Sequence, residues 1–99
     1  MDIDDTLIEV QKIIERHAPP GTQTILFGSW AKGDAQPNSD LDVGILAPKL
    51  VPFEIITRIR NEVEAIPTLR KIDVVDLNAV DAPFREAALA HHRVLTPSS

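Results

Sequence analysis

Three segments of the chain repeat their hydrophobic residues at the spacing of an α-helix. The first spans residues 2–17, and its apolar stripe consists of Ile3, Leu7, Val10, Ile14 and His17. The second spans residues 53–65, with a stripe of Ile55, Ile56, Ile59, Val63 and Ile66. Asp81 as an N-cap and Pro83 in the first turn predict a last helix that extends to about residue 91. Its apolar side would consist of Phe84, Ala87, Ala88 and Leu89.

Three short runs between these segments are typical of β-strands: residues 22–27, 41–46 and 71–77. The second run alternates, so that one face carries Leu41, Val43 and Ile45 and the other carries Asp40, Asp42 and Gly44. Residues 32–39 form a polar loop with little room for a crossover helix, which predicts that the first two strands are antiparallel. The order of elements predicts an α/β fold in which helices cover a small mixed sheet.

The length and charge of the chain limit the partners that it can bind. With 99 residues the chain forms one domain, residues 1–99, and we expect residues 96–99 to fray. Ten basic residues stand against fifteen acidic ones, a net charge of −5. This charge repels a long phosphate backbone, so we expect no extended nucleic-acid binding. A small pocket for one nucleotide is compatible with it, especially if metal ions lower the local negative charge.

The composition also bears on where the protein works. There is no cysteine, which excludes disulfides, thiol catalysis and cysteine-ligated zinc. The first residues have neither the basic nor the apolar region of a signal peptide, and no apolar run approaches the roughly 18 residues of a membrane span. We therefore expect a soluble, cytoplasmic protein that does not bind membranes.

Three aspartates are the strongest candidates for chemistry. Asp40 and Asp42 are two residues apart on a predicted strand, so they share a face with Cα atoms about 6.6 Å apart. Carboxylates at this separation can converge on a pair of Mg²⁺ or Mn²⁺ ions. The same strand is otherwise apolar and should lie inside the sheet, where unpaired carboxylates are unfavourable without cations. Asp73 lies among branched apolar residues in the third strand and is the candidate third ligand, whereas Asp76 near its end suits a turn with Asn78.

A glycine and a serine follow the first strand directly. Gly28 lets the backbone turn and lets an anion approach closely, and Ser29 would open a short helix whose first N–H groups suit a phosphate. Taken alone, the pair is more simply a strand-to-helix turn with Ser29 as the N-cap.

The two motifs together resemble the signature of the DNA polymerase β-like nucleotidyltransferase superfamily. Residues 27–33 read Phe-Gly-Ser-Trp-Ala-Lys-Gly, and residues 39–43 read Ser-Asp-Leu-Asp-Val. The ten residues 30–39 separate Gly-Ser from Asp-x-Asp, as that signature requires. Length and element order are most similar to the minimal nucleotidyltransferases (MNT proteins), so the resemblance covers nearly the whole chain and implies a polymerase β-like palm core.

The resemblance implies a role for each matching residue. Gly28 and Ser29, together with Lys32 and Gly33, would bind the nucleoside triphosphate. Asp40, Asp42 and Asp73 would be catalytic and would hold two Mg²⁺ ions, with Mn²⁺ as a substitute. Position 30 is often basic in relatives but is Trp30 here, which leaves Lys32 as the nearest cation for phosphate, and Trp30 is a candidate to pack on a partner or a base.

The implied reaction is Mg²⁺-dependent transfer of a nucleoside monophosphate, preferably AMP from ATP, to a hydroxyl. Relatives of this size commonly act beside an α-helical HEPN protein as the antitoxin of a toxin–antitoxin pair, so a HEPN-family partner is implied as well. The alternative is an antitoxin or scaffold module that neutralises its partner by binding, without turnover.

Other candidate sites have simpler explanations. Residues 28–33 lack the glycine spacing and the Ser or Thr of a P-loop, and Ser39 stands where a calcium loop needs glycine. His91 and His92 would point about 100° apart on a helix, which favours a solvated helix end over a metal site. Arg70 and Lys71 are most simply solvated, although their position near Asp73 also suits a substrate phosphate.

Overall fold

The computed structural model describes residues 1–95, so the expectation for residues 96–99 lies outside the described residues. Its elements follow in the order α1 (Ile3–His17), β1 (Gln23–Phe27), α2 (Ser29–Lys32), β2 (Leu41–Leu46), α3 (Phe53–Glu64), β3 (Ile72–Asp76), α4 (Ala82–Ala90) and β4 (Arg93–Leu95). The three long helices and the first three strands confirm the predicted elements to within about two residues at each end.

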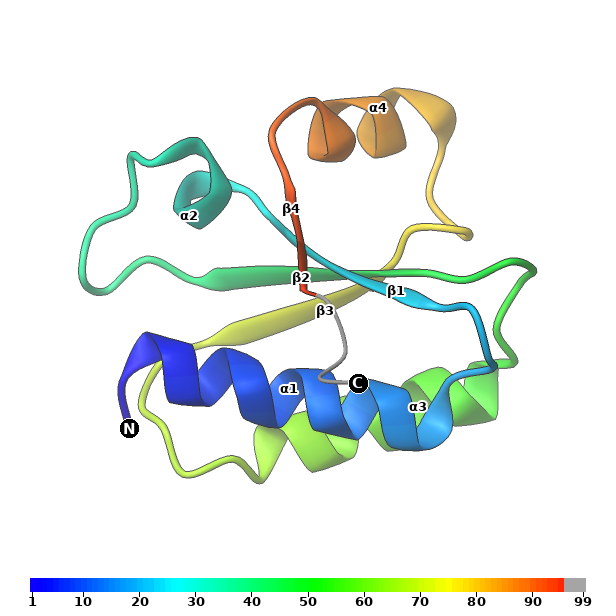
Figure 1. Cartoon of the computed structure of the whole chain (residues 1–99), viewed down its shortest axis with the longest axis horizontal. Coiled ribbons are helices and arrows are strands. Elements are labelled where there is room, and N and C mark those ends of the chain that lie inside the picture. Colours follow the sequence, from blue (N-terminus) through cyan, green and yellow to red (C-terminus); the bar gives the residue numbers. More distant parts are fainter. Residues whose placement is uncertain (96–99) are drawn as a thin grey trace.

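The four strands form one mixed sheet in the order β3-β2-β1-β4 (Figure 1). β1 and β2 are antiparallel, as the short polar connection predicts, and Phe27 lies opposite Asp42. β2 and β3 are parallel, and their register sets Asp42 beside Asp73. The prediction that the Asp-x-Asp strand lies inside the sheet is confirmed, because β2 has a neighbour on both sides.

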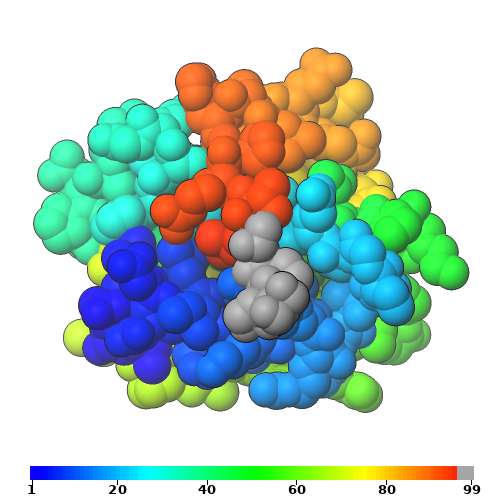
Figure 2. Space-filling model, viewed as in Figure 1, coloured from blue at the N-terminus to red at the C-terminus, as the bar shows by residue number. Residues whose placement is uncertain are grey.

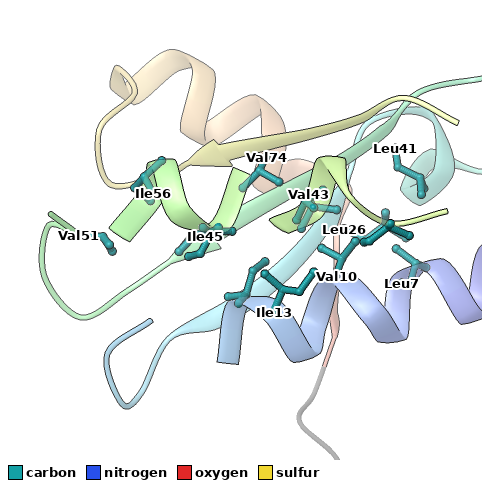
Figure 3. Close-up of a cluster of buried hydrophobic side chains, with 14 of the residues drawn as sticks. Leu7, Val10, Ile13, Leu26, Leu41, Val43, Ile45, Val51, Ile56 and Val74 are labelled. Carbon is teal, nitrogen blue, oxygen red and sulfur yellow. The ribbon is translucent and has the colours of Figure 1, made fainter. Parts of the chain in front are cut away.

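Helices cover both faces of the sheet (Figure 1). α1 and α3 pack on one face, where Leu41, Val43 and Ile45 of β2 are fully buried. Figure 3 shows these three side chains directed at residues of α1 and α3, among them Val10 and Ile56. The odd-numbered residues of β2 therefore form the main core, and Asp42 and Gly44 face the opposite side.

α1 and α3 are also joined by polar contacts at the end of α1. Glu62 of α3 accepts from Arg16 at 2.6 Å, and its other carboxylate oxygen contacts Nε2 of His17. The side chain of His17 is only 15% exposed. The histidine at the end of the α1 stripe is therefore a packed residue that links two helices.

α4 covers the other face only in part. Its N-cap is Asp81, as predicted, and the carboxylate accepts from the backbone N–H of Phe84 at 2.9 Å. Ala88 is buried against this face, and Phe84 meets Phe27 edge to face at 6.1 Å. The predicted apolar side is partly wrong, because Ala87 is exposed and Phe84 is 44% exposed. At about 100° per residue, residues 84, 87, 88 and 89 spread over roughly 200° around the helix axis, so they cannot all face the sheet.

β4 is an element that the sequence did not predict. Its three residues pair antiparallel with β1, with Val94 beside Ile25. Three residues are too few for an alternating pattern to be recognised, so the pairing depends on the β1 edge that the rest of the fold supplies. Figure 2 shows β4 (red) on the surface between α4 (orange) and α1 (blue).

In residues 1–95, no helix is both long and apolar enough to cross a membrane.

Candidate active site

Asp42 and Asp73 come together because neighbouring parallel strands place them side by side. The two residues are register partners in β2 and β3 and are both partly buried. Asp40 precedes the first residue of β2 and is exposed. The structure thus brings together two of the three predicted acids within the sheet and places the third at the entrance of the same strand.

The charges of these acids act on one another. Burial raises the pKa of the Asp42 carboxyl, and the negative charges of Asp73 and then Asp40 raise it further. Lys71, two residues before Asp73, lowers this pKa and opposes the effect. The direction of the net shift shows that the described protein groups do not fully compensate the negative charge at Asp42.

This donor set suits a hard divalent cation. Carboxylate oxygens are the ligands that Mg²⁺ and Mn²⁺ prefer, and a cation would favour the ionised form of Asp42. Within residues 1–95, however, no three His, Cys, Asp or Glu side chains already lie in a metal-binding arrangement. The three acids are therefore neighbours, and their side chains would have to change conformation to bind one ion together.

Gly28 forms the junction between β1 and α2, directly against Asp42. Its φ of 74° and ψ of −154° lie in a region that only glycine adopts readily. A Cβ atom at this position would overlap Oδ2 of Asp42 and approach Cγ to 3.1 Å. The strand-to-helix turn that the sequence predicted is thus packed on the carboxylate of the second motif, and Gly28 takes the N-cap position in place of Ser29.

α2 carries the other residues predicted to bind nucleotide. Ser29 is its first residue, Lys32 is exposed in its last turn, and Gly33 ends it in the left-handed conformation with φ 84°. The carbonyl of Ser29 accepts from the backbone N–H groups of Gly33 and Asp34 at 3.0 and 3.2 Å. The short helix α2 therefore begins beside Asp42. That its residues bind a nucleotide stays a prediction.

Trp30 is partly buried and packs within its own chain, and its contact with a partner or a base stays a prediction. Its Nε1–H donates to the carbonyl of Ser39 at 3.2 Å. The guanidinium carbon of Arg70 lies 5.0 Å from the ring centroid. Arg70 also donates to the carbonyl of Pro37 at 2.7 Å, so it is not simply a solvated charge. The sequence did not predict this contact, because Trp30 and Arg70 are 40 positions apart and neither belongs to a helix-period or strand-period pattern.

The remaining candidates behave as the simpler explanations predicted. Asp76 is buried and accepts from the backbone N–H of Asn78 at 3.0 Å, which confirms the turn. His91 and His92 are exposed, and Nδ1 of His92 lies 2.7 Å from the carbonyl of Leu89.

A cavity of about 520 Å³ opens beside Asp40, lined among others by Asn38, Arg70 and Lys71.

Comparison with known proteins agrees with this geometry. The family model described as "Polymerase beta, Nucleotidyltransferase" matches residues 9–99. No curated protein matches the sequence.

Among solved structures, a toxin–antitoxin with AMP-PNP is 20% identical, with a TM-score of 0.72 over 98% of this chain and 75% of that chain. A candidate minimal nucleotidyltransferase is 22% identical, with a TM-score of 0.68 over 94% of this chain and 95% of that chain. A complex from Shewanella oneidensis, in which a tri-AMPylated HEPN toxin is bound to an MNT antitoxin, is 20% identical, with a TM-score of 0.62 over 94% of this chain and 73% of that chain.

At these identities the structural similarity shows a common fold, and together with the family model it confirms the predicted mixed sheet with a nucleotidyltransferase core. The family model covers almost the entire chain, including β1, α2 and all three candidate acids. This chain therefore belongs to the polymerase beta nucleotidyltransferase family.

Proposed function

We propose that this chain transfers AMP from ATP to a hydroxyl group of a HEPN-type partner protein and acts in this way as the antitoxin of a toxin–antitoxin pair. The observation that carries the proposal is the register of β2 and β3, which pairs Asp42 with Asp73 beneath the backbone of Gly28. Similar folds in a toxin–antitoxin with AMP-PNP and in a complex of an AMPylated HEPN toxin with an MNT antitoxin support the choice of AMP and of partner.

The residues of the site would have two roles, binding of the triphosphate and binding of the metal ions. Gly28 and Ser29 would hold the triphosphate at the start of α2, where the missing side chain at position 28 leaves room for the carboxylate of Asp42. Lys32 and Gly33 would hold the same group from the end of this short helix. Asp40, Asp42 and Asp73 would hold the divalent ions, of which we propose two Mg²⁺, with Mn²⁺ as a substitute. Such ions, when bound, neutralise phosphate charge and stabilise the charge that develops on the transferred group.

The step itself is an in-line substitution at the α-phosphorus. A bond forms between the acceptor oxygen and the α-phosphorus, while the bond from this phosphorus to the bridging oxygen breaks and pyrophosphate leaves. The carboxylate of Asp73 would take the proton of the acceptor hydroxyl, a role that its place on the edge strand of the sheet allows. The cavity beside Asp40 offers space next to the site in which part of the acceptor could lie.

The test is transfer of label from α-labelled ATP with Mg²⁺ to a HEPN-type protein, with the product of the neighbouring gene as the first acceptor to be tried. We expect label on the partner, and we expect Asp40→Asn to lower its rate by about 10- to 100-fold or more, because it removes a charged metal ligand and even the groups that orient such ligands contribute this much. Asp34→Asn is the matched control, because it removes an exposed acid from the same loop and should leave the rate unchanged.

The alternative of neutralisation by binding makes a different prediction. If the wild-type chain transfers no label, and Asp40→Asn and Asp73→Asn still neutralise the partner, then the chain is a binding module and the proposal is wrong.

A further inference from the structure

Arg70 lies where the three segments that carry the motif residues meet. It precedes Asp73 by three residues, and its guanidinium group lies over the ring of Trp30, the residue that follows Ser29. Its Nη1 donates to the carbonyl of Pro37 at 2.7 Å and approaches the carbonyl of Ser39, the residue before Asp40, at 3.4 Å. From the segment just before β3, one side chain thus contacts both α2 and the loop before Asp40.

The backbone around Asp40 is held on both sides. On one side, the Ser39 carbonyl accepts from the indole N–H of Trp30 at 3.2 Å. Ser39 also closes a turn with Gln36, whose N–H donates to the serine hydroxyl at 2.8 Å and whose carbonyl accepts from the serine N–H at 2.9 Å. On the other side, Leu41 donates to the carbonyl of Lys71 at 2.9 Å and enters the sheet.

The contacts also indicate that phosphate binding is not the main use of Arg70. Its Nη1 already lies near two backbone carbonyls, and one face of the guanidinium group covers an indole. Lys71 is exposed and lowers the pKa of Asp42, so it is the neighbouring cation whose charge acts on this acid.

We propose that Arg70 is a positioning residue that, together with Trp30, fixes the backbone before Asp40 so that this carboxylate can act in metal binding beside Asp42. The inference rests on the proposed function, because it assigns Asp40 to a metal ion. Groups that orient a metal ligand through hydrogen bonds typically contribute 10- to 100-fold to metal affinity. Without Arg70, the Pro37 carbonyl loses its hydrogen bond from the guanidinium group, and the Ser39 carbonyl keeps only the one from Trp30.

The test measures Mn²⁺ binding to the full chain directly, by electron paramagnetic resonance, without relying on turnover. We expect Arg70→Met to weaken Mn²⁺ binding about tenfold. We expect Arg70→Lys to restore little, since an ammonium group lacks the planar guanidinium that reaches a carbonyl while stacking on an indole. Trp30→Phe keeps an aromatic ring at this position and removes the indole N–H, so it should weaken Mn²⁺ binding by a smaller factor.

Arg85→Met is the matched control. Arg85 also holds two backbone carbonyls, those of Leu77 and Val80 at 2.7 and 3.2 Å, but in the turn before α4. We expect it to lower the melting temperature as Arg70→Met does and to leave Mn²⁺ affinity unchanged. Hydrogen exchange of residues 36–41 should become faster in Arg70→Met and not in Arg85→Met.

Each outcome separates this inference from the proposed function. Folded Arg70→Met and Trp30→Phe proteins that bind Mn²⁺ like the wild type would overturn the positioning role and leave AMP transfer standing. A wild-type chain whose Mn²⁺ affinity falls in Arg70→Met but which labels no partner would overturn the transfer and support the positioning role. A wild-type chain that binds no Mn²⁺ contradicts both.

Discussion

Asp42 is the residue at which the stability of the fold and the proposed chemistry oppose each other. Its side chain lies in a sheet, beside Asp73 and against the backbone of Gly28. Burial and the neighbouring acids raise its pKa, so the folded chain holds this proton to a higher pH than the unfolded chain does. The folded state therefore loses stability as the pH rises from the ordinary aspartate pKa through the raised one.

This sign predicts the behaviour of Asp42→Asn. Without divalent cations, the variant should gain free energy of unfolding relative to the wild type as the pH rises into the neutral range, because it has no charge to desolvate. Below the ordinary pKa of aspartate the relative gain should vanish, since the wild-type carboxyl is then neutral as well. Thermal melting across this pH range checks the prediction, with Asp34→Asn as an exposed control. A difference between the wild type and Asp42→Asn that does not change with pH would contradict it.

At the scale of elements, the junction from β1 to α2 joins the two halves of the motif. Gly28 ends the strand and caps the helix, and the space that a side chain would need is taken by Asp42. The sequence predicted both the strand and the short helix from their residues. It did not predict that this turn packs on the second motif, because the contact depends on the antiparallel pairing of Phe27 with Asp42.

Two glycines of this segment provide a matched pair of substitutions. Gly28→Ala should destabilise the protein by about 1–3 kcal/mol from backbone strain alone, and the overlap with Asp42 adds to this loss. Gly33 also has a positive φ, but nothing lies within 4 Å of its added Cβ, so Gly33→Ala should cost only about 1 kcal/mol. Chemical denaturation of both variants measures the difference, and equal losses would show that Asp42 does not restrict position 28.

α4 and β4 show where local sequence patterns were too weak to predict the structure. α4 starts at the predicted N-cap because a carboxylate reaches a backbone N–H three residues ahead, a local interaction. Its buried face was only partly predictable, since which side chains meet Phe27 and Leu77 depends on where the helix lies on the sheet. β4 also depends on the tertiary structure, because it forms by pairing with the edge of β1.

At the scale of the whole molecule, helices cover one face of the sheet fully and the other in part. α1 and α3 bury the main core, whereas α4 and the short α2 share the face on which Asp42 lies (Figure 1). Asp40 is exposed and Asp73 lies on an edge strand, so solvent reaches the candidate site. A ligand that reaches this site would bind the folded chain and not the unfolded one.

Mg²⁺ with ATP should therefore raise the melting temperature. At ten times the dissociation constant, binding adds about 1.4 kcal/mol to the free energy of unfolding. For a domain of this size, this gain corresponds to a rise of roughly 5–10 °C. Asp73→Asn should show a smaller rise under the same conditions. An unchanged melting curve of the wild type at millimolar ATP would count against a nucleotide site.

The sequence by itself determined the helices, three of the four strands, the mixed sheet and the identity of the candidate acids. These features follow from short-range physics: the period of apolar residues, the capping groups, and a connection too short for a crossover. The spacing of Gly-Ser and Asp-x-Asp also identified the family, which the family model confirms.

Only the tertiary structure decided how these parts meet. The register of parallel strands set Asp73 beside Asp42, and the antiparallel register of β1 brought Gly28 against the same carboxylate. The contact of Arg70 with Trp30 joins residues 40 positions apart in the sequence. Such contacts depend on the positions of whole elements in space, and no local pattern of residue types encodes those positions.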